Sequence, residues 1–146
     1  MGKGVLDMSY LPPAKSDTHI TPDRVYDMIL ETWGIEKKMM FDPCPVDGTD
    51  GLVISWKDFN FVNPPYTLLK EFVAKALDEA RYGNRTVMLL PSKTDQAWFH
   101  DLVYNHRGIE IKWIKGRLKF KNNKWSATQP HFLALIQEEK GTVNYW

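Results

Sequence analysis

The chain has 146 residues and a mass of 17.0 kDa, the length of one compact domain. Apolar residues make up 43% and charged residues 25%, which is typical of a globular protein rather than a disordered one. A single cysteine excludes an internal disulfide framework and a cysteine-rich zinc site. The net charge of +1 conceals an asymmetry, since residues 1–73 carry a net charge of −4 and residues 74–146 one of +5. A basic second half permits a nucleic-acid partner.

The first part of the chain predicts an irregular arm followed by a helix. Residues 1–16 are interrupted by glycine and proline and predict the arm, and residues 17–146 predict a single domain. The helix is expected to begin at Thr21-Pro22-Asp23, with Thr21 as the N-cap, and to end at Gly34.

The next elements alternate between strand and helix. We expect a short strand over Met39–Phe41, a loop over residues 45–58 and a second strand over Phe59–Val62. Two prolines in Asn63-Pro64-Pro65-Tyr66 end that strand, because proline cannot continue a central ladder. Residues 67–82 then predict an amphipathic helix.

The second half continues the alternation. The apolar run Thr86–Leu90 predicts a parallel strand that is covered on both faces. A helix is expected over residues 95–104, a strand over Ile109–Ile114 and a last strand over His131–Ile136. The pattern predicts an α/β fold with a mostly parallel sheet that finishes in a C-terminal antiparallel hairpin.

Ligands of open α/β sheets bind at the carboxyl ends of the strands. In this chain those ends are expected at Asp42-Pro43-Cys44, at the residues 63–66 and at Pro91-Ser92-Lys93-Thr94.

The Asn63–Tyr66 segment has the chemistry to bind a planar amine such as the exocyclic N6 of adenine. The Asn63 side-chain oxygen and the Pro64 carbonyl can each accept one amino hydrogen, which favours a pyramidal nitrogen with an available lone pair. Pro65 stiffens the turn and offers no competing N–H, and Tyr66 presents a face on which an extruded base can stack. The structural alternative is a rigid turn after a strand.

Further motifs follow one another in order from about residue 15 to residue 135. They are Lys15-Ser16-Asp17, Thr21-Pro22, residues 41–44, Trp56, residues 61–66, Leu89-Leu90-Pro91, Thr94-Asp95, Trp98-Phe99-His100, residues 116–120, Ser126-Ala127 and Pro130. In this combination the chain resembles the small phage-type DNA N6-adenine methyltransferases, which use S-adenosylmethionine (SAM).

The resemblance implies a Rossmann-like methyltransferase fold with the SAM site at the first strand. It implies that Asn63, Pro64, Pro65 and Tyr66 are the catalytic residues. The cofactor-binding residues that it implies are Asp17, Thr21, Pro22, Asp42, Pro43, Cys44 and Asn63.

The chain also departs from larger methyltransferases. No Gly-x-Gly follows Asp42, and only about 18 residues separate the two motif strands, so we expect a shortened sheet. Asp47 and Asp50 are the candidates for the acid that binds the SAM ribose.

Cys44 raises an alternative, because Pro43-Cys44 resembles the nucleophile of cytosine C5 methyltransferases. In those enzymes the dipeptide stands where this chain has the Asn63–Tyr66 segment. Cys44 is therefore expected to be a packing residue.

A basic segment is the candidate DNA-binding element. Residues 112–124 hold six lysines and arginines, no acidic residue, and interleaved aromatic residues. Phosphate contacts supply much of DNA affinity, although such a run is also compatible with a solvated strand face. The nucleic-acid candidates are Lys93, Thr94, Arg117, Lys119 and Lys121. No cluster of residues has metal-ligand spacing, so we expect no metal.

Together these observations predict a SAM-dependent enzyme that methylates adenine N6 in double-stranded DNA with the target base flipped out. An N-methyltransferase acting on RNA or on a protein glutamine is the alternative with the same chemistry. A second alternative, without methyl transfer, is a non-catalytic DNA-binding protein on a methyltransferase scaffold. The chain lacks a signal peptide and a membrane-spanning run, which predicts a cytoplasmic protein, in the host cytoplasm if its origin is viral.

Overall fold

The computed structural model describes residues 19–45, 50–104 and 106–139. The predicted arm over residues 1–16 and the candidate SAM-binding residues Asp17 and Asp47 lie outside the described residues.

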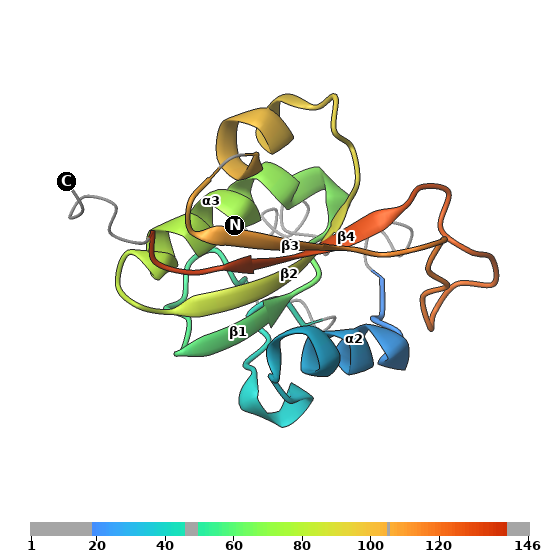
Figure 1. Cartoon of the computed structure of the whole chain (residues 1–146), viewed down its shortest axis with the longest axis horizontal. Helices are drawn as coiled ribbons and strands as arrows, with labels where there is room; N and C mark the ends of the chain where they lie inside the picture. Colours follow the sequence, from blue (N-terminus) through green and yellow to red (C-terminus); the bar gives the residue numbers. More distant parts are fainter. Residues whose placement is uncertain (1–18, 46–49, 105, 140–146) are drawn as a thin grey trace, which may run out of the picture.

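A four-stranded mixed sheet forms the centre of the structure (Figure 1). Its strands are β1 (Phe59–Val62), β2 (Arg85–Pro91), β3 (Ile109–Trp113) and β4 (His131–Ile136), in the order β1-β2-β4-β3. β1 and β2 are parallel, whereas β4 is antiparallel to both of its neighbours.

The prediction of a mostly parallel sheet is therefore wrong, and the predicted antiparallel hairpin of the last two strands is confirmed. The physical reason is the insertion of β4 between β2 and β3. All six residues of β4 are buried, as a strand that is apolar on both faces requires. β3 has no fully buried residue and takes the edge position.

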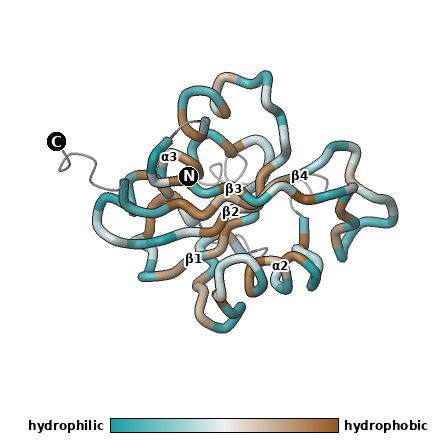
Figure 2. The backbone as a smooth tube through the Cα atoms, viewed as in Figure 1, coloured by the Kyte–Doolittle hydropathy of each residue, from teal (hydrophilic) through white to brown (hydrophobic). Residues whose placement is uncertain are grey.

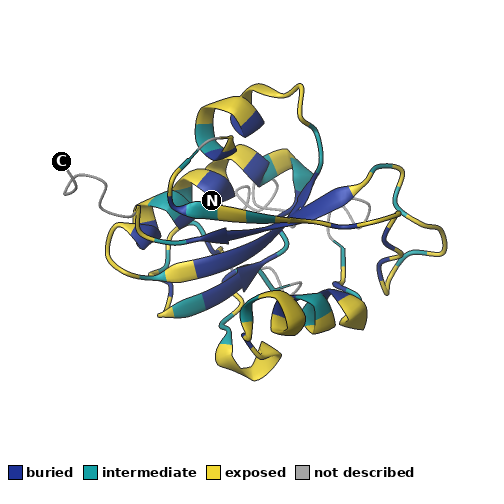
Figure 3. Ribbon diagram, viewed as in Figure 1, coloured by how far each residue is buried: buried dark blue, intermediate teal, exposed yellow. Residues whose placement is uncertain are grey.

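Helices cover both faces of the sheet (Figure 1). α2 (Asp23–Trp33) lies on one face and buries Val25 and Ile29. α3 (Leu69–Ala80) lies on the other face, together with a π-helical turn over Phe99–Val103. Apolar residues follow the strands in Figure 2, and Figure 3 shows β2 and β4 as buried along most of their length, whereas β3 is partly exposed.

Several predicted elements have different ends or a different form. The predicted strand over Met39–Phe41 is wrong, because a 3₁₀ helix occupies Lys37–Met39 and only Phe41 forms a parallel bridge, to Asn60. The helix predicted over residues 67–82 is a 3₁₀ turn over Tyr66–Leu68 followed by α3.

The helix predicted over residues 95–104 has a wide π-helical turn as its main part. In α2 the N-cap position belongs to Pro22, and no side chain caps it, so the prediction that Thr21 is the N-cap is wrong. Gly34 ends α2 as predicted, in the left-handed conformation with φ of 71°.

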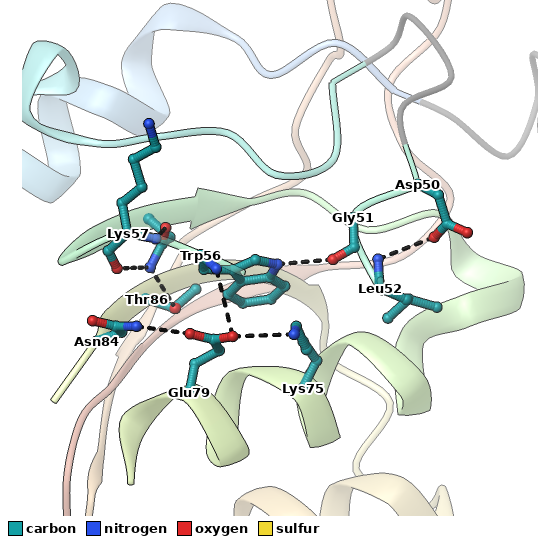
Figure 4. Close-up of polar contacts among 10 residues, drawn as sticks. Asp50, Gly51, Leu52, Trp56, Lys57, Lys75, Glu79, Asn84 and Thr86 are labelled. Carbon is teal, nitrogen blue, oxygen red and sulfur yellow. Dashed lines mark hydrogen bonds and ion pairs between the residues drawn. The ribbon is translucent and has the colours of Figure 1, made fainter. Parts of the chain in front are cut away.

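A buried polar network fixes the turn between Gly51 and β1 against α3 (Figure 4). The Trp56 indole N–H donates to the Gly51 carbonyl over 2.8 Å. The Glu79 carboxylate accepts hydrogen bonds from the Trp56 backbone over 3.5 Å and from the Asn84 amide over 2.7 Å, and it pairs with Lys75 at 3.0 Å. Burial raises the pKa of Glu79, but the donors around it outweigh burial and hold the pKa below its usual value.

Replacing Glu79 by alanine is expected to lower the free energy of unfolding by about 1–3 kcal/mol, because it leaves buried donors without an acceptor. The neighbouring Asp78→Ala change is the control, since the Asp78 side chain is exposed and its pair with Arg81, at 3.9 Å, lies at the surface. Urea unfolding of both variants measures the difference. Equal stability of the two variants would contradict a structural role for this network.

Candidate active site

Several segments end along one side of the sheet, at the carboxyl ends of the parallel strands. We call this side the edge of the sheet. β1 and β2 are parallel, and Phe41 bridges Asn60 in the same direction. The chain therefore leaves these three segments on the same edge, at Asp42, at Asn63 and at Ser92. β4 runs in the opposite direction and begins there, with His131 opposite Pro91.

The Asn63 carboxamide is held in one orientation. Its Nδ2 donates to the His19 carbonyl over 2.8 Å and to the Thr21 hydroxyl over 3.0 Å. A carbonyl oxygen can only accept, so the amide nitrogen must face His19. No described residue donates a hydrogen bond to the Asn63 Oδ1, which leaves this oxygen as the acceptor that the site presents.

Thr21 acts on Asn63 instead of capping α2. Its side chain is buried, and its hydroxyl accepts the Asn63 amide N–H. The pKa of Tyr26 is raised, mainly by burial, so its hydroxyl stays protonated. Because the Tyr26 ring packs on Phe61 of β1 with centroids 5.1 Å apart, the first turn of α2 is fixed to the strand that precedes Asn63.

Pro64 and Pro65 are buried, and the Pro65 carbonyl accepts the backbone N–H of Leu68 over 3.0 Å. The two prolines thus turn the chain directly from β1 into the 3₁₀ turn that carries Tyr66. The rigid turn anticipated from the sequence is present, and it serves to place Tyr66 at the edge of the sheet.

Tyr66 is held by the last strand. Its hydroxyl lies 2.8 Å from Nε2 of His131, which is 1% exposed. The His19 ring packs against Tyr66 at 5.1 Å and stacks on Phe120 at 4.7 Å, and Phe120 meets His131 at 5.4 Å. These four rings form a continuous aromatic cluster beside Asn63.

A cavity of about 390 Å³ opens beside this cluster. Its walls are His19, Tyr66, Phe120 and the residues 122–128. The Asn123 amide lies 3.1 Å from His19 Nδ1, and Asn122 accepts the backbone N–H of Ile20 over 2.9 Å. The cavity has the volume of a small-molecule site, with aromatic walls and a few polar groups.

His19 and His131 are site residues that sequence reasoning missed. They lie 44 and 65 positions from their partners Asn63 and Tyr66. No local pattern signals such contacts, because they depend on the approach to α2 and on the position of β4.

The Asp42–Cys44 loop lies at the same edge and is fixed by short contacts. The Asp42 carboxylate accepts the Cys44 backbone N–H over 2.8 Å. Gly51 lies so close to the loop that a Cβ atom there would be 2.1 Å from the Pro43 carbonyl oxygen.

Burial raises the pKa of the Cys44 thiol to about 12, and the carboxylates of Asp42 and Asp50 add to the shift. The thiol packs against the core on the α3 side of the sheet. A thiol in this environment is not a nucleophile at neutral pH.

The candidate DNA-binding residues lie around the edge and in the connection 114–130, which projects from the sheet (Figure 1). Lys93 is half-buried and Thr94 is exposed, directly after β2. Arg117 donates to the Thr128 carbonyl and Lys119 to the Asn123 carbonyl, so both side chains brace this connection. Lys121 forms an ion pair with Asp23 at 2.7 Å, which neutralises part of its charge.

The described residues contain no group of three or more histidine, cysteine, aspartate or glutamate side chains that could hold a metal ion. None of the helices in this part of the chain is long and apolar enough to cross a membrane.

Comparison with known proteins identifies the family. The family model of the DNA N-6-adenine-methyltransferase (Dam) matches residues 8–137. The chain belongs to the Dam family. The resemblance described from the sequence motifs is thereby confirmed.

A relative within the family is the DNA N-6-adenine-methyltransferase of Escherichia phage T1, with 38% identity over 81 residues. The matched region is 56% of this chain and 33% of the phage protein, so it spans about a third of that Dam protein's length. No solved structure matches the chain.

His131 should make the stability of the protein depend on pH. Burial lowers its pKa from about 6.5, the ordinary value of a histidine, to about 4, with a further contribution from His19. Between pH 6.5 and 4 the unfolded chain therefore binds more protons than the folded one, and stability falls as the pH falls. A shift of this size corresponds to about 3 kcal/mol.

Urea unfolding of the wild type and of His131→Gln at pH 7 and pH 5 measures this contribution. The glutamine variant should lose less stability on acidification than the wild type, whereas the exposed-residue control His100→Gln should behave as the wild type does. Parallel pH profiles of the wild type and His131→Gln would contradict the assignment.

Proposed function

We propose that this chain is a DNA methyltransferase that transfers a methyl group from SAM to the exocyclic N6 of adenine. Membership of the Dam family supports this function. The observation that carries it is the fixed orientation of the Asn63 amide, whose nitrogen is bound by His19 and Thr21 while its oxygen is presented at the edge of the sheet.

The Asn63 Oδ1 and the Pro64 carbonyl accept the two hydrogens of the target amine. Holding both hydrogens withdraws the nitrogen lone pair from the ring and directs it away from the two acceptors. Orientation and electrostatic complementarity supply the catalysis, and no strongly basic side chain is required.

The Asp42–Cys44 loop has the chemistry to hold SAM. Asp42 is an exposed carboxylate, and Asp42 and Asp50 give this end of the edge a negative charge, which adds to the effect of burial on the pKa of Cys44. Such a surface suits a cofactor that carries an ammonium and a sulfonium group. When bound, SAM supplies the electrophilic methyl group.

Asp17, Thr21, Pro22 and Asn63 complete the cofactor-binding set that we propose, although Thr21 acts through Asn63 in the described structure. The parallel arrangement of Phe41, β1 and β2, followed by an antiparallel pair, supports a shortened Rossmann-like sheet as the scaffold.

The cavity beside Tyr66 suits a base extruded from double-stranded DNA, since its walls are aromatic rings and asparagine side chains. Lys93, Thr94, Arg117, Lys119 and Lys121 are proposed to contact the DNA. We place the reaction in the cytoplasm of a phage host, in keeping with the phage T1 relative.

The orientation of Asn63 can be tested by kinetics. Asn63→Ala should lower the single-turnover rate of methyl transfer to adenine-containing DNA by about 10²–10³-fold, because it removes an acceptor that acts in the transition state. Thr21→Val removes one of the two acceptors that hold the Asn63 amide and should lower the rate by up to about tenfold. Thr21→Ser keeps a hydroxyl and should retain most of the wild-type rate.

Calorimetry of SAM binding to each variant separates cofactor affinity from the rate of transfer. Labelled SAM offered with RNA or protein substrates in parallel tests the alternative acceptors. A wild-type rate for Asn63→Ala would reduce the Asn63–Tyr66 segment to a rigid turn. Equal rates for Thr21→Val and Thr21→Ser would show that the Thr21 hydroxyl does not position Asn63.

The basic connection should contribute salt-dependent DNA binding. The double change Arg117→Ala and Lys119→Ala should flatten the slope of log affinity against log salt by about 1.8 if both side chains neutralise phosphates. Arg81→Ala is the control, because Arg81 lies at the end of α3, outside the connection and the candidate site, and should leave the slope unchanged. An unchanged slope in the double variant would assign Arg117 and Lys119 to the bracing of the connection alone.

A further inference from the structure

A second and larger cavity lies outside the candidate active site. It has a volume of about 830 Å³ and lies between the π-helical turn Phe99–Val103 and one face of β3. Ile109, Ile111 and Trp113 of β3 line one side, and His100 and Tyr104 line the other. We call this cavity the β3 groove.

Aromatic rings follow one another along the β3 groove. Tyr104 lies 6.0 Å from His100 and stacks on Phe99 at 6.2 Å. Phe99 meets Phe132 at 5.9 Å, and Phe132 meets Trp113 at 5.1 Å. Phe99 and Phe132 are buried, so they form the supporting layer, whereas Tyr104 and Trp113 are 57% and 54% exposed.

The two exposed rings line the same cavity, and exposed apolar surface that is gathered in one groove suits a ligand or partner. Because Trp113 rests on Phe132 and Tyr104 on Phe99, the two exposed rings are supported from below and can offer their outer surfaces to a ligand at little cost in ordering.

The charge of the β3 groove selects the class of ligand. Its lining contains the Arg107 guanidinium and no acidic residue within the described part of the chain. Glu110, the acidic residue of β3, belongs to the other face, where it accepts hydrogen bonds from Trp33 and Gln137. A groove with stacking rings and a guanidinium suits a planar ring attached to an anion.

The β3 groove also opens at the edge of the sheet that carries Asn63. β3 is antiparallel to β4, which is antiparallel to β2, so β2 and β3 end on the same side of the sheet. Thr94, which follows β2, and Trp113, which ends β3, therefore bring the groove to the edge that carries Asn63.

We propose that the β3 groove is a nucleic-acid subsite that binds unpaired nucleotides, with bases stacked on Tyr104 and Trp113 and phosphate contacted by Arg107. Stacking on an aromatic ring needs a base whose face is accessible, which paired bases inside a duplex do not offer. The subsite is separate from the cavity beside Tyr66, and the inference does not require methyl transfer.

Binding of a labelled oligothymidylate, followed by fluorescence anisotropy, tests the proposal. This probe contains no adenine, so it cannot bind as a methyl acceptor. Tyr104→Ala and Trp113→Ala should each weaken binding by about tenfold, since a stacked base is lost in each case. Trp113→Phe keeps a ring and should restore most of the affinity, which separates stacking from damage to the fold.

Tyr82→Ala is the matched control, because Tyr82 is 76% exposed and does not line the β3 groove. Its affinity should equal that of the wild type. The proposal is overturned if the wild type does not bind the probe, or if Tyr104→Ala and Trp113→Ala bind it as Tyr82→Ala does. It is also overturned if these two changes weaken binding of a fully paired duplex as much as they weaken binding of oligothymidylate.

Methyl transfer to adenine-containing DNA, measured on the same preparations, keeps this test apart from the proposed function. An inactive wild type that binds oligothymidylate through Tyr104 and Trp113 would refute the methyltransferase proposal and retain the subsite.

Discussion

The Asn63 side chain ties two distant parts of the chain together through one nitrogen atom. Its Nδ2 binds the His19 carbonyl and the Thr21 hydroxyl, and those residues lead directly into α2. The same two bonds fix the direction of the amide oxygen. An asparagine without such partners would rotate freely, and the conformational entropy lost on binding substrate would be larger. Preorganisation of the candidate site therefore depends on the segment that precedes α2.

The central position of β4 in the sheet explains how Tyr66 is held. A strand whose residues are all buried has to lie between two others, and this places His131 beside the carboxyl end of β2. From there His131 reaches the Tyr66 hydroxyl. Burial at this position disfavours the charged imidazole of His131 and lowers its pKa. The same strand supplies Phe132 to the β3 groove, so the two cavities share one support.

Sequence patterns predicted the elements whose signals are local. The limits of β4, the end of α2 at Gly34 and the turn at the Asn63–Tyr66 segment are all confirmed. The direction of the strands was not predictable in the same way. Thr86–Leu90 and His131–Ile136 are both continuous apolar runs, and such a run reports burial on both faces but not the direction of the neighbouring strand.

The role of Thr21 shows a second limit of sequence reasoning. A threonine followed by Pro-Asp has the local signature of an N-cap, and that signature is satisfied equally well by a residue that bonds elsewhere. The competing partner, Asn63, lies 42 positions away. His19 and His131 were missed for the same reason, because their contacts arise from the tertiary arrangement and leave no periodic trace. Motif comparison found Asn63 and Tyr66, whereas the residues that hold them became visible only in the structure.

The acidic residues of the first half of the chain and the basic residues of the second half lie at different places in the fold. The acidic first half contributes Asp42 and Asp50, whose carboxylates surround Cys44 at one end of the edge. The basic second half contributes Arg117 and Lys119 to the projecting connection at the other end. A positively charged cofactor and a polyanionic substrate would be attracted to opposite ends of the same edge, with Asn63 between them. Steering of this kind falls off over about 10 Å at moderate salt, so it acts locally, on ligands that already touch the surface. A net charge near zero for the whole chain is therefore compatible with strong and opposite fields at the two ends of the proposed site.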